Sequence, residues 1–287
     1  MIRRNFIKNT AIAGAALGLG NSIQAAPAFS SSSLKGNVNH SVARWSYGYL
    51  SLEELCKEVK RIGFSAIDLV GPKEWDILKR HGVDSSMCNG AEINLTDGWN
   101  DKTFHEQLIK NYTEVIPLVA KAGYKNLICF SGNRRNLRDD EGLANCVLGL
   151  KKVIGVAEKH GVTLQMELFN TKVDHPGYMC DNTKWAIALC EALGSENFKL
   201  LYDIYHMQIN EGNLIQTIRE NHQYFGHYHT AGVPGRHEIN NSQEINYPAV
   251  MKAIVETGFK GYVAQEFIPT AENKIASLEE AISICDV

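Results

Sequence analysis

Short apolar runs alternate with longer amphipathic segments along most of the chain. The apolar runs have the length of strands and occupy residues 42–46, 66–70, 83–88, 126–130, 162–168, 199–203, 225–229 and 262–267. Segments with apolar residues at helical spacing follow them, at residues 51–63, 73–81, 103–122, 141–160, 183–193, 214–220, 248–257 and 277–285. Eight alternations of this kind predict an α/β fold, a parallel (β/α)8 barrel or TIM barrel.

Signals at the ends of the segments support this division. Ser51 is followed three residues later by Glu54, which is the capping-box pattern that begins a helix. Glycines stand just before four of the expected strands, at Gly63, Gly123, Gly161 and Gly258. A doubly wound open sheet would alternate in the same way, but the chain has no Gly-rich phosphate fingerprint of the kind that such sheets carry.

The N-terminal stretch differs from the rest of the chain. Arg3 and Arg4 precede a weakly apolar stretch at residues 10–20 that is rich in alanine and glycine, and small residues follow it. This order resembles a twin-arginine export signal, and the stretch is too short to span a bilayer as a helix. A basic, unstructured N-terminus is the alternative. We expect residues 1–30 to be a signal and flexible segment of an exported or periplasmic protein, and residues 31–287 to form a single barrel domain.

Composition narrows the class of partner. The net charge of -3 offers no electrostatic case for nucleic-acid binding, and no later apolar run is long enough to cross a membrane. The seven cysteines show no paired spacing, so we expect buried small side chains in place of a disulfide framework. A small-molecule substrate fits this composition, and the sequence leaves a homo-oligomer open.

Four residues that can bind a metal close four of the expected strands in the second half of the chain. They are Glu167, Asp203, His229 and Glu266, and they are separated by 36, 26 and 37 residues. A parallel barrel gathers the carboxyl ends of its strands on one face, so these groups can converge. Any one of them alone could equally be a carboxylate bonded to backbone or arginine. Together they favour a single divalent ion, for which Mg, Mn, Co and Zn all suit three carboxylates and one imidazole.

Three further residues lie near these ligands in the expected fold. His206 comes three residues after Asp203, beyond the strand end, and Arg236 lies in the loop after the strand of His229. We expect both to bind substrate, against the alternatives of a helix-capping histidine and a solvated loop arginine. His227 and His229 are two residues apart and therefore face the same side of the sheet, which makes His227 a deeper interior residue or a partner of the ligands.

Several motifs make the chain resemble a known family. The segments Leu201-Tyr202-Asp203-Ile204-Tyr205-His206-Met207-Gln208, Pro234-Gly235-Arg236-His237-Glu238 and Glu167-Leu168-Phe169-Asn170 are similar to hydroxypyruvate isomerases, within the xylose isomerase-like barrels of sugar isomerases and epimerases. The resemblance implies that Glu167, Asp203, His229 and Glu266 are the metal ligands. It further implies that Glu167 and Glu266 are the catalytic acid and base, and that His206 and Arg236 bind substrate.

The chain also departs from that pattern. His229 stands where the bacterial hydroxypyruvate isomerases have glutamine and the ketose 3-epimerases have histidine, and Cys88 or Met87 stands where a histidine is expected on the third strand. An export signal is also unusual for a central metabolic isomerase.

Both enzyme hypotheses use proton transfer beside a carbonyl. The first is a divalent-metal-dependent isomerase that acts on a small hydroxy-carbonyl or sugar substrate through an enediolate. Its specific example is the conversion of hydroxypyruvate to tartronate semialdehyde. The alternative is a ketose 3-epimerase or related keto-sugar enzyme. A non-catalytic periplasmic sugar-binding barrel is less favoured, because a binder has little reason to keep two opposed glutamates. An endonuclease on the same barrel is less favoured still, because it commonly needs more metal ions and a basic face.

Overall fold

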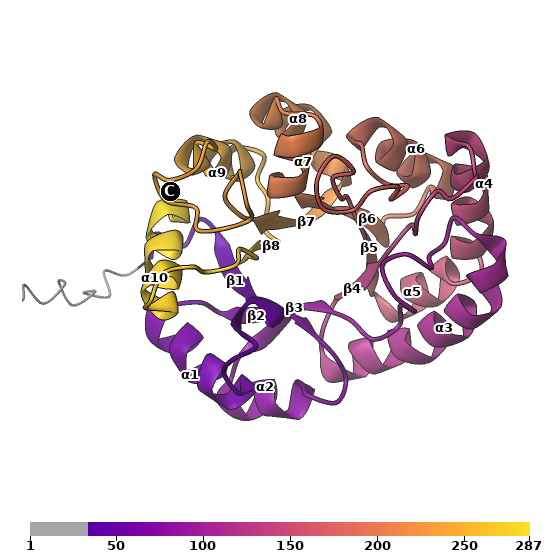
Figure 1. Ribbon diagram of the computed structural model, residues 1–287. Coiled ribbons are helices and arrows are strands. Elements are labelled where there is room, and N and C mark those ends of the chain that lie inside the picture. Colours follow the sequence, from indigo (N-terminus) through magenta and orange to yellow (C-terminus); the bar gives the residue numbers. More distant parts are fainter. Residues whose placement is uncertain (1–33) are drawn as a thin grey trace, which may run out of the picture. The chain divides into compact units, whose positions relative to one another are not determined.

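The structure is a computed structural model that describes residues 34–287, and it confirms the barrel that the sequence predicts (Figure 1). Within these residues eight parallel strands close in sequence order, and the last strand pairs with the first. The strands are β1 (Asn39–Ala43), β2 (Ala66–Val70), β3 (Asp84–Cys88), β4 (Asn126–Cys129), β5 (Thr163–Glu167), β6 (Phe198–Asp203), β7 (Phe225–Thr230) and β8 (Tyr262–Gln265). The expected export signal lies outside the described residues.

Helices surround the strands (Figure 1). The α-helices are α1 (Leu52–Ile62), α2 (Trp75–His81), α3 (His105–Ala122), α4 (Asp139–Leu150), α5 (Ile154–His160), α6 (Thr183–Leu193), α7 (Ile204–Asn210), α8 (Leu214–Asn221), α9 (Tyr247–Glu256) and α10 (Lys274–Cys285). Short 3-10 turns are η1 (Trp45–Tyr47), η2 (Lys102–Phe104) and η3 (His222–Tyr224).

The predicted start and end signals of the first helix are present in the structure. The Ser51 hydroxyl accepts the backbone N–H of Glu54, and the Glu54 carboxylate accepts the backbone N–H of Ser51 at 2.8 Å, so α1 begins with both exposed donors satisfied. α1 ends at Gly63, whose φ of 113° is a conformation that a side chain would strain. The helix therefore turns directly into β2 and lays its apolar face on the barrel.

Two element predictions were wrong, and one helix was missed. The expected helix at residues 141–160 is two helices, α4 and α5, and the first strand is β1 at Asn39–Ala43 instead of residues 42–46. α4 ends just after Gly149, where an added Cβ would lie 2.7 Å from the Trp99 ring, so close packing fixes the chain there. α7 was missed, because its seven residues are too few to show a helical period and most are buried.

One strand contains an irregularity that matters for the site. Leu69 on β2 has a φ of 60°, and the pairing of β2 with β3 shifts register on both sides of Asp68. A bulge of this kind breaks the strict alternation of side chains, so neighbouring residues of one strand can both reach the interior.

The core lies mainly between the strands and the helices, and the barrel interior is polar at several positions. Fully buried polar side chains there include Asp68, Gln165, His227 and His229. All seven cysteines are buried and free in residues 34–287, as the sequence indicated. Over the same residues no helix is both long and apolar enough to cross a membrane.

Candidate metal centre and substrate cavity

The barrel brings the four predicted ligands together. Glu167, Asp203 and His229 lie at the carboxyl ends of β5, β6 and β7, and Glu266 directly follows β8. The Nδ1 atom of His229 lies 3.0 Å from Oε1 of Glu167, 3.0 Å from Oε2 of Glu266 and 3.9 Å from Oδ2 of Asp203. One potential ligand atom from each of the four falls within 4.8 Å of all the others.

The donor atoms of this cluster fit a cation. Glu167, Asp203 and Glu266 are each at most 3% exposed. In the described part of the chain no hydrogen-bond partner is found for Oε1 of Glu167, Oδ2 of Asp203 or Nδ1 of His229. Buried carboxylate oxygens without partners are costly, and a divalent ion among them would satisfy all of these atoms at once.

Burial and mutual repulsion shift the pKa values of these carboxyls in different directions. Burial raises the pKa of Glu167 to about 7 and that of Asp203 to about 6, and the nearby Glu266 carboxylate adds to both. Burial alone would raise the pKa of Glu266 too, but the charges of His229 and Arg236 outweigh it and hold that pKa well below its ordinary value. The protein without a cation therefore does not readily carry three negative charges in this space.

His229 is oriented by a residue that the sequence analysis did not single out. Its Nε2 atom lies 2.8 Å from Oδ2 of Asp68, a fully buried carboxylate on β2. His227 faces the same interior, with its Nε2 atom 3.0 Å from Oδ1 of Asp68, so it is the deeper interior residue that its spacing predicted. The signal for Asp68 was present: like Glu167, it is an acidic residue inside an apolar run, Ala66-Ile67-Asp68-Leu69-Val70.

Arg236 reaches the cluster from the loop after β7. Its guanidinium donates to Glu266 in a short contact and lies over the rings of Trp45, at 5.1 Å, and Tyr205, at 5.6 Å. Trp45 also donates its indole N–H to Oε1 of Glu266 at 2.8 Å. Arg236 is therefore placed at the ligands instead of being a solvated loop residue, and Trp45 is a second contact that the sequence analysis missed.

His206 lies on α7 directly above Asp203. Its backbone N–H donates to Oδ1 of Asp203 at 3.0 Å, which caps α7 and fixes that carboxylate. The Asn170 amide donates to Nδ1 of His206 at 2.7 Å, because its Oδ1 is already occupied by two backbone N–H groups. The proton of His206 is therefore on Nε2, a buried atom that lies 3.6 Å from Oδ2 of Asp203 and has no hydrogen-bond partner within residues 34–287.

A cavity of about 310 Å³ adjoins the cluster. Its polar lining consists of Glu167, His175, Arg236 and Glu266. The rest of the wall is apolar and is formed by Trp45, Leu69, Leu95, Ile128, Phe130 and Phe169. A pocket with a few convergent polar groups in an apolar wall is typical of a site for a small molecule.

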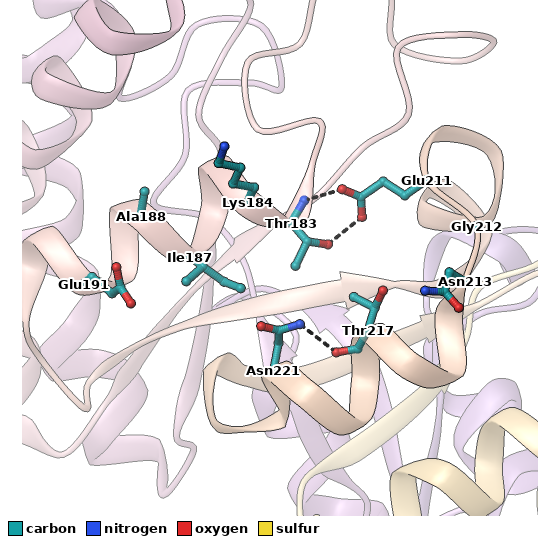
Figure 2. A pocket seen from close by; sticks show the side chains of 10 residues that line it. All are labelled: Thr183, Lys184, Ile187, Ala188, Glu191, Glu211, Gly212, Asn213, Thr217 and Asn221. Atoms are coloured by element: carbon teal, nitrogen blue, oxygen red, sulfur yellow. Dashed lines mark hydrogen bonds between the residues drawn. The ribbon is translucent and has the colours of Figure 1, made fainter.

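A second hollow lies away from this chemistry. Figure 2 shows it between α6 and α8, with Glu211 accepting the backbone N–H and the hydroxyl of Thr183. None of the predicted site residues lines it. Glu211 caps the first turn of α6 there, so the visible polar contacts have a structural role.

Comparisons with known proteins agree with the fold. The sequence model described as xylose isomerase-like TIM barrel matches residues 46–284. A human protein named putative hydroxypyruvate isomerase is 34% identical over 43% of this chain, and the alignment spans only 44% of that protein. A 2-oxo-tetronate isomerase of Pectobacterium atrosepticum is 30% identical over 74% of this chain and 84% of its own length.

Solved structures share the barrel at lower identity. An AP endonuclease family 2 protein from Brucella melitensis has a TM-score of 0.74 and 21% identity, covering 83% of this chain and 96% of its own. A D-psicose 3-epimerase from Clostridium cellulolyticum H10 has a TM-score of 0.72 and 15% identity, covering 87% and 100%. The IOLI protein, solved with a zinc atom, has a TM-score of 0.67 and 16% identity, covering 86% and 95%. At these identities the likeness concerns the fold.

Proposed function

We propose a function from one premise, that this chain belongs to the xylose isomerase-like TIM barrel family. The protein is an isomerase that moves a proton between neighbouring carbons of a small hydroxy-carbonyl compound. The observation that carries the proposal is the pair of buried glutamates, Glu167 and Glu266, each 3.0 Å from the same imidazole nitrogen and both lining the cavity. The candidate substrates are hydroxypyruvate and a 2-oxo-tetronate, which are the compounds in the names of the two relatives described above.

The site holds one divalent ion in this proposal. Glu167, Asp203, His229 and Glu266 are its ligands, and their three carboxylates and one imidazole accept Mn, Mg, Co or Zn. Bound there, the ion would polarise the substrate carbonyl and stabilise the charge that develops on its oxygen. The zinc in the IOLI protein supports a metal site on this fold and leaves the identity of the ion open.

The protein's own residues then bind the substrate and move its proton. His206 presents Nε2–H as a donor toward the site, and Arg236 supplies a planar donor group at the cavity wall. One glutamate removes the proton beside the carbonyl, and the same or the other glutamate returns it. The apolar wall around Ile128, Phe130 and Phe169 keeps bulk water away from these transfers.

The second candidate is a ketose 3-epimerase or related keto-sugar enzyme. Its support is His229, which matches the epimerase pattern in the sequence, together with two carboxylates that can act on opposite faces of one carbon. The two reactions differ in the carbon that receives the proton. The cavity of about 310 Å³ has the volume of roughly ten waters, so it also accommodates a sugar longer than three carbons.

A product assay decides between these reactions. Purified protein with Mn or Mg is incubated with hydroxypyruvate, a 2-oxo-tetronate and a set of free ketoses, and the products are identified by NMR. Conversion of either oxo-acid to its isomer is the expected result. Epimerised ketose without oxo-acid turnover moves the assignment to the second candidate, and no conversion of any of them contradicts the proposal.

We propose in addition that the protein is exported by the twin-arginine route. The support is the order of Arg3, Arg4, apolar stretch and small residues at the N-terminus. Replacing both arginines by lysine should retain the protein in the cytoplasm with unchanged specific activity. Cell fractionation with an immunoblot measures this, and equal export of both forms would contradict the proposal.

A further inference from the structure

A second group of ionisable side chains lies in the barrel interior next to the proposed ligands. It consists of Asp68, His227 and His229, all fully buried. Oδ1 of Asp68 is 3.0 Å from Nε2 of His227, and Oδ2 is 2.8 Å from Nε2 of His229. Among residues 34–287 no lysine or arginine forms an ion pair with Asp68, so the two imidazoles are its only ionisable partners.

The barrel brings Asp68 to this place from the other side of the interior. β2 and β7 are not neighbours, because β1 and β8 separate them in the closed sheet (Figure 1). The bulge at Leu69 lets β2 supply Asp68 to the interior and the next side chain to the cavity wall. A left-handed backbone at a leucine is unfavourable, and such strain is typical of positions that the surrounding structure holds for function.

Hydrogen bonding then decides which nitrogen of His229 carries the proton. The Ser86 hydroxyl donates its one proton to Oδ1 of Asp68 at 2.6 Å, so in the 2.8 Å contact with Ser41 the Ser41 hydroxyl donates to the Ser86 oxygen. An ionised carboxylate only accepts, so the 2.8 Å contact with His229 requires a proton on Nε2. Nδ1 is therefore the nitrogen left to bind an ion, and it faces Glu167, Asp203 and Glu266.

We propose that Asp68 is a positioning residue for the metal centre. It holds His229 in the Nε2–H tautomer and fixes the ring so that Nδ1 is directed at the ion, and it does so without contacting ion or substrate. This proposal rests on the proposed function for the presence of a metal. A carboxylate behind a ligating histidine generally contributes 10- to 100-fold to metal affinity.

The same three residues could instead hold a second ion, and the geometry disfavours it. Both oxygens of Asp68 already lie at hydrogen-bond distance from their partners, and Oδ1 also accepts from Ser86. An ion between Oδ2 and Nε2 of His229 would need bonds of about 2.0–2.2 Å to each atom, where a hydrogen bond now spans the gap. We therefore expect one ion per chain.

The test measures metal binding by the full chain directly. The metal-free protein and its Asp68→Ala and Asp68→Asn variants are titrated with Zn and Mn by calorimetry. Wild type should bind one equivalent, Asp68→Ala should bind about 10- to 100-fold more weakly, and Asp68→Asn should fall between, because an amide oxygen still accepts from Nε2–H without carrying a charge. Glu211→Gln, which removes the carboxylate bonded to Thr183 at the start of α6, away from the cluster and the cavity, is the matched control and should leave affinity unchanged.

A spectroscopic readout separates positioning from general damage. With histidine labelled by nitrogen-15, NMR of the zinc-loaded protein reports the tautomer of His229, identified by the signals that are lost in His229→Gln. Wild type should show Nε2–H, and Asp68→Ala should show a mixture or the other tautomer. If Asp68→Ala does not fold, Ser86→Ala and Asp68→Asn give the same comparison in a milder form.

The outcomes are distinct. Equal affinity and an unchanged tautomer in the Asp68 variants overturn the positioning role while leaving the metal centre intact. Two equivalents in wild type and one in Asp68→Ala overturn it in favour of a second ion. Absence of binding in well-folded wild type contradicts the proposed function itself.

Discussion

At the scale of single residues, the chemistry is divided between side chains that meet at one nitrogen atom. Glu167 and Glu266 approach His229 from β5 and from the residue after β8, and Arg236 and Trp45 both donate to Glu266. Among residues 34–287, no comparable donor reaches Oε1 of Glu167. The two glutamates therefore lie at the same distance from Nδ1 of His229, but only Glu266 accepts hydrogen bonds from Arg236 and Trp45.

Replacing either glutamate tests its role as an acid or base. Glu167→Gln and Glu266→Gln keep the side-chain shape and remove the proton-accepting group, so we expect turnover to fall by about 10²- to 10⁴-fold. Steady-state kinetics with saturating metal measures this. The control is Gln208→Glu, the reverse substitution at a partly exposed residue that contacts Glu244 and does not line the cavity. Wild-type turnover in both glutamine variants would remove these residues from the mechanism.

Arg236 is predicted to act on substrate binding. Lysine at this position keeps a charge and loses the planar donor group stacked on Trp45 and Tyr205, so KM should rise by about 10-fold or more while metal affinity changes little. Arg135→Lys, which alters an arginine paired with Asp97 outside the cavity lining, is the matched control. An unchanged KM in Arg236→Lys would contradict substrate binding by this residue.

Sequence spacing predicted the convergence of the four proposed ligands and missed their partners. Glu167 and Asp203 end their strands and His229 stands one residue before the end of β7, so the three share one face of any parallel barrel. Asp68 contacts His229 across the barrel from β2, and Trp45 contacts Glu266 from the turn after β1, a neighbour of β8 in the barrel that is distant in sequence. No local pattern records a contact of that kind, although a carboxylate in an apolar run was a sign for Asp68.

At the scale of elements, loops after strands place the reactive groups. α7 begins at the end of β6 with Asp203 as its N-cap, which is why His206 lies above the ligands. The periodicity that identified the long helices carries no information on a helix of seven residues, so α7 was not predicted. The break between α4 and α5 was hidden because the apolar period continues across it.

Glu238 joins the loop after β7 to the loop after β8. Its carboxylate accepts the backbone N–H groups of Thr270 and Ala271 and the hydroxyls of Thr270 and Ser277. Burial opposes ionisation, but these hydrogen bonds outweigh it and lower the pKa of Glu238 to about 2. Because Arg236 stands two residues earlier in the same loop, this anchor also holds the arginine in place.

Glu238→Gln should therefore destabilise the fold in a pH-dependent way. The depressed pKa means that the ionised carboxylate stabilises the protein above the unfolded value of about 4.3, and that this contribution is lost as pH falls through about 2. We expect the variant to lose about 1–3 kcal/mol of unfolding free energy at pH 7 and progressively less below pH 4.5. Urea unfolding at several pH values measures the difference, and a constant difference down to pH 3 would contradict this account.

At the scale of the whole molecule, eight repeats of one unit make a site from residues as distant in sequence as Glu167 and Glu266. Regular alternation of strand and helix patterns predicted the closed barrel, because few other folds repeat in this way. The ring of strands then determined which strand ends meet. The period does not record local bulges such as the one at Leu69, where the pairing of β2 with β3 shifts register.

Metal binding should stabilise the described barrel as a unit. An ion at 100 times its dissociation constant adds about 2.7 kcal/mol, which corresponds to roughly 5–10 °C in Tm for a domain of this size. Thermal unfolding with and without a chelator measures this, and the Asp203→Asn variant should show a much smaller difference. Identical Tm values for the metal-loaded and chelated protein would contradict a structural contribution of the ion.

The central claim is metal-dependent proton transfer beside a carbonyl, and solvent exchange tests it most directly. The protein with Mn is incubated in D2O with hydroxypyruvate, a 2-oxo-tetronate or a ketose, and deuterium at each carbon is measured by NMR. We predict deuterium at a carbon next to the carbonyl of at least one of these compounds, lost on chelation and in both Glu167→Gln and Glu266→Gln. Exchange that persists in both variants, or its absence with every compound in the metal-loaded wild type, would contradict the account.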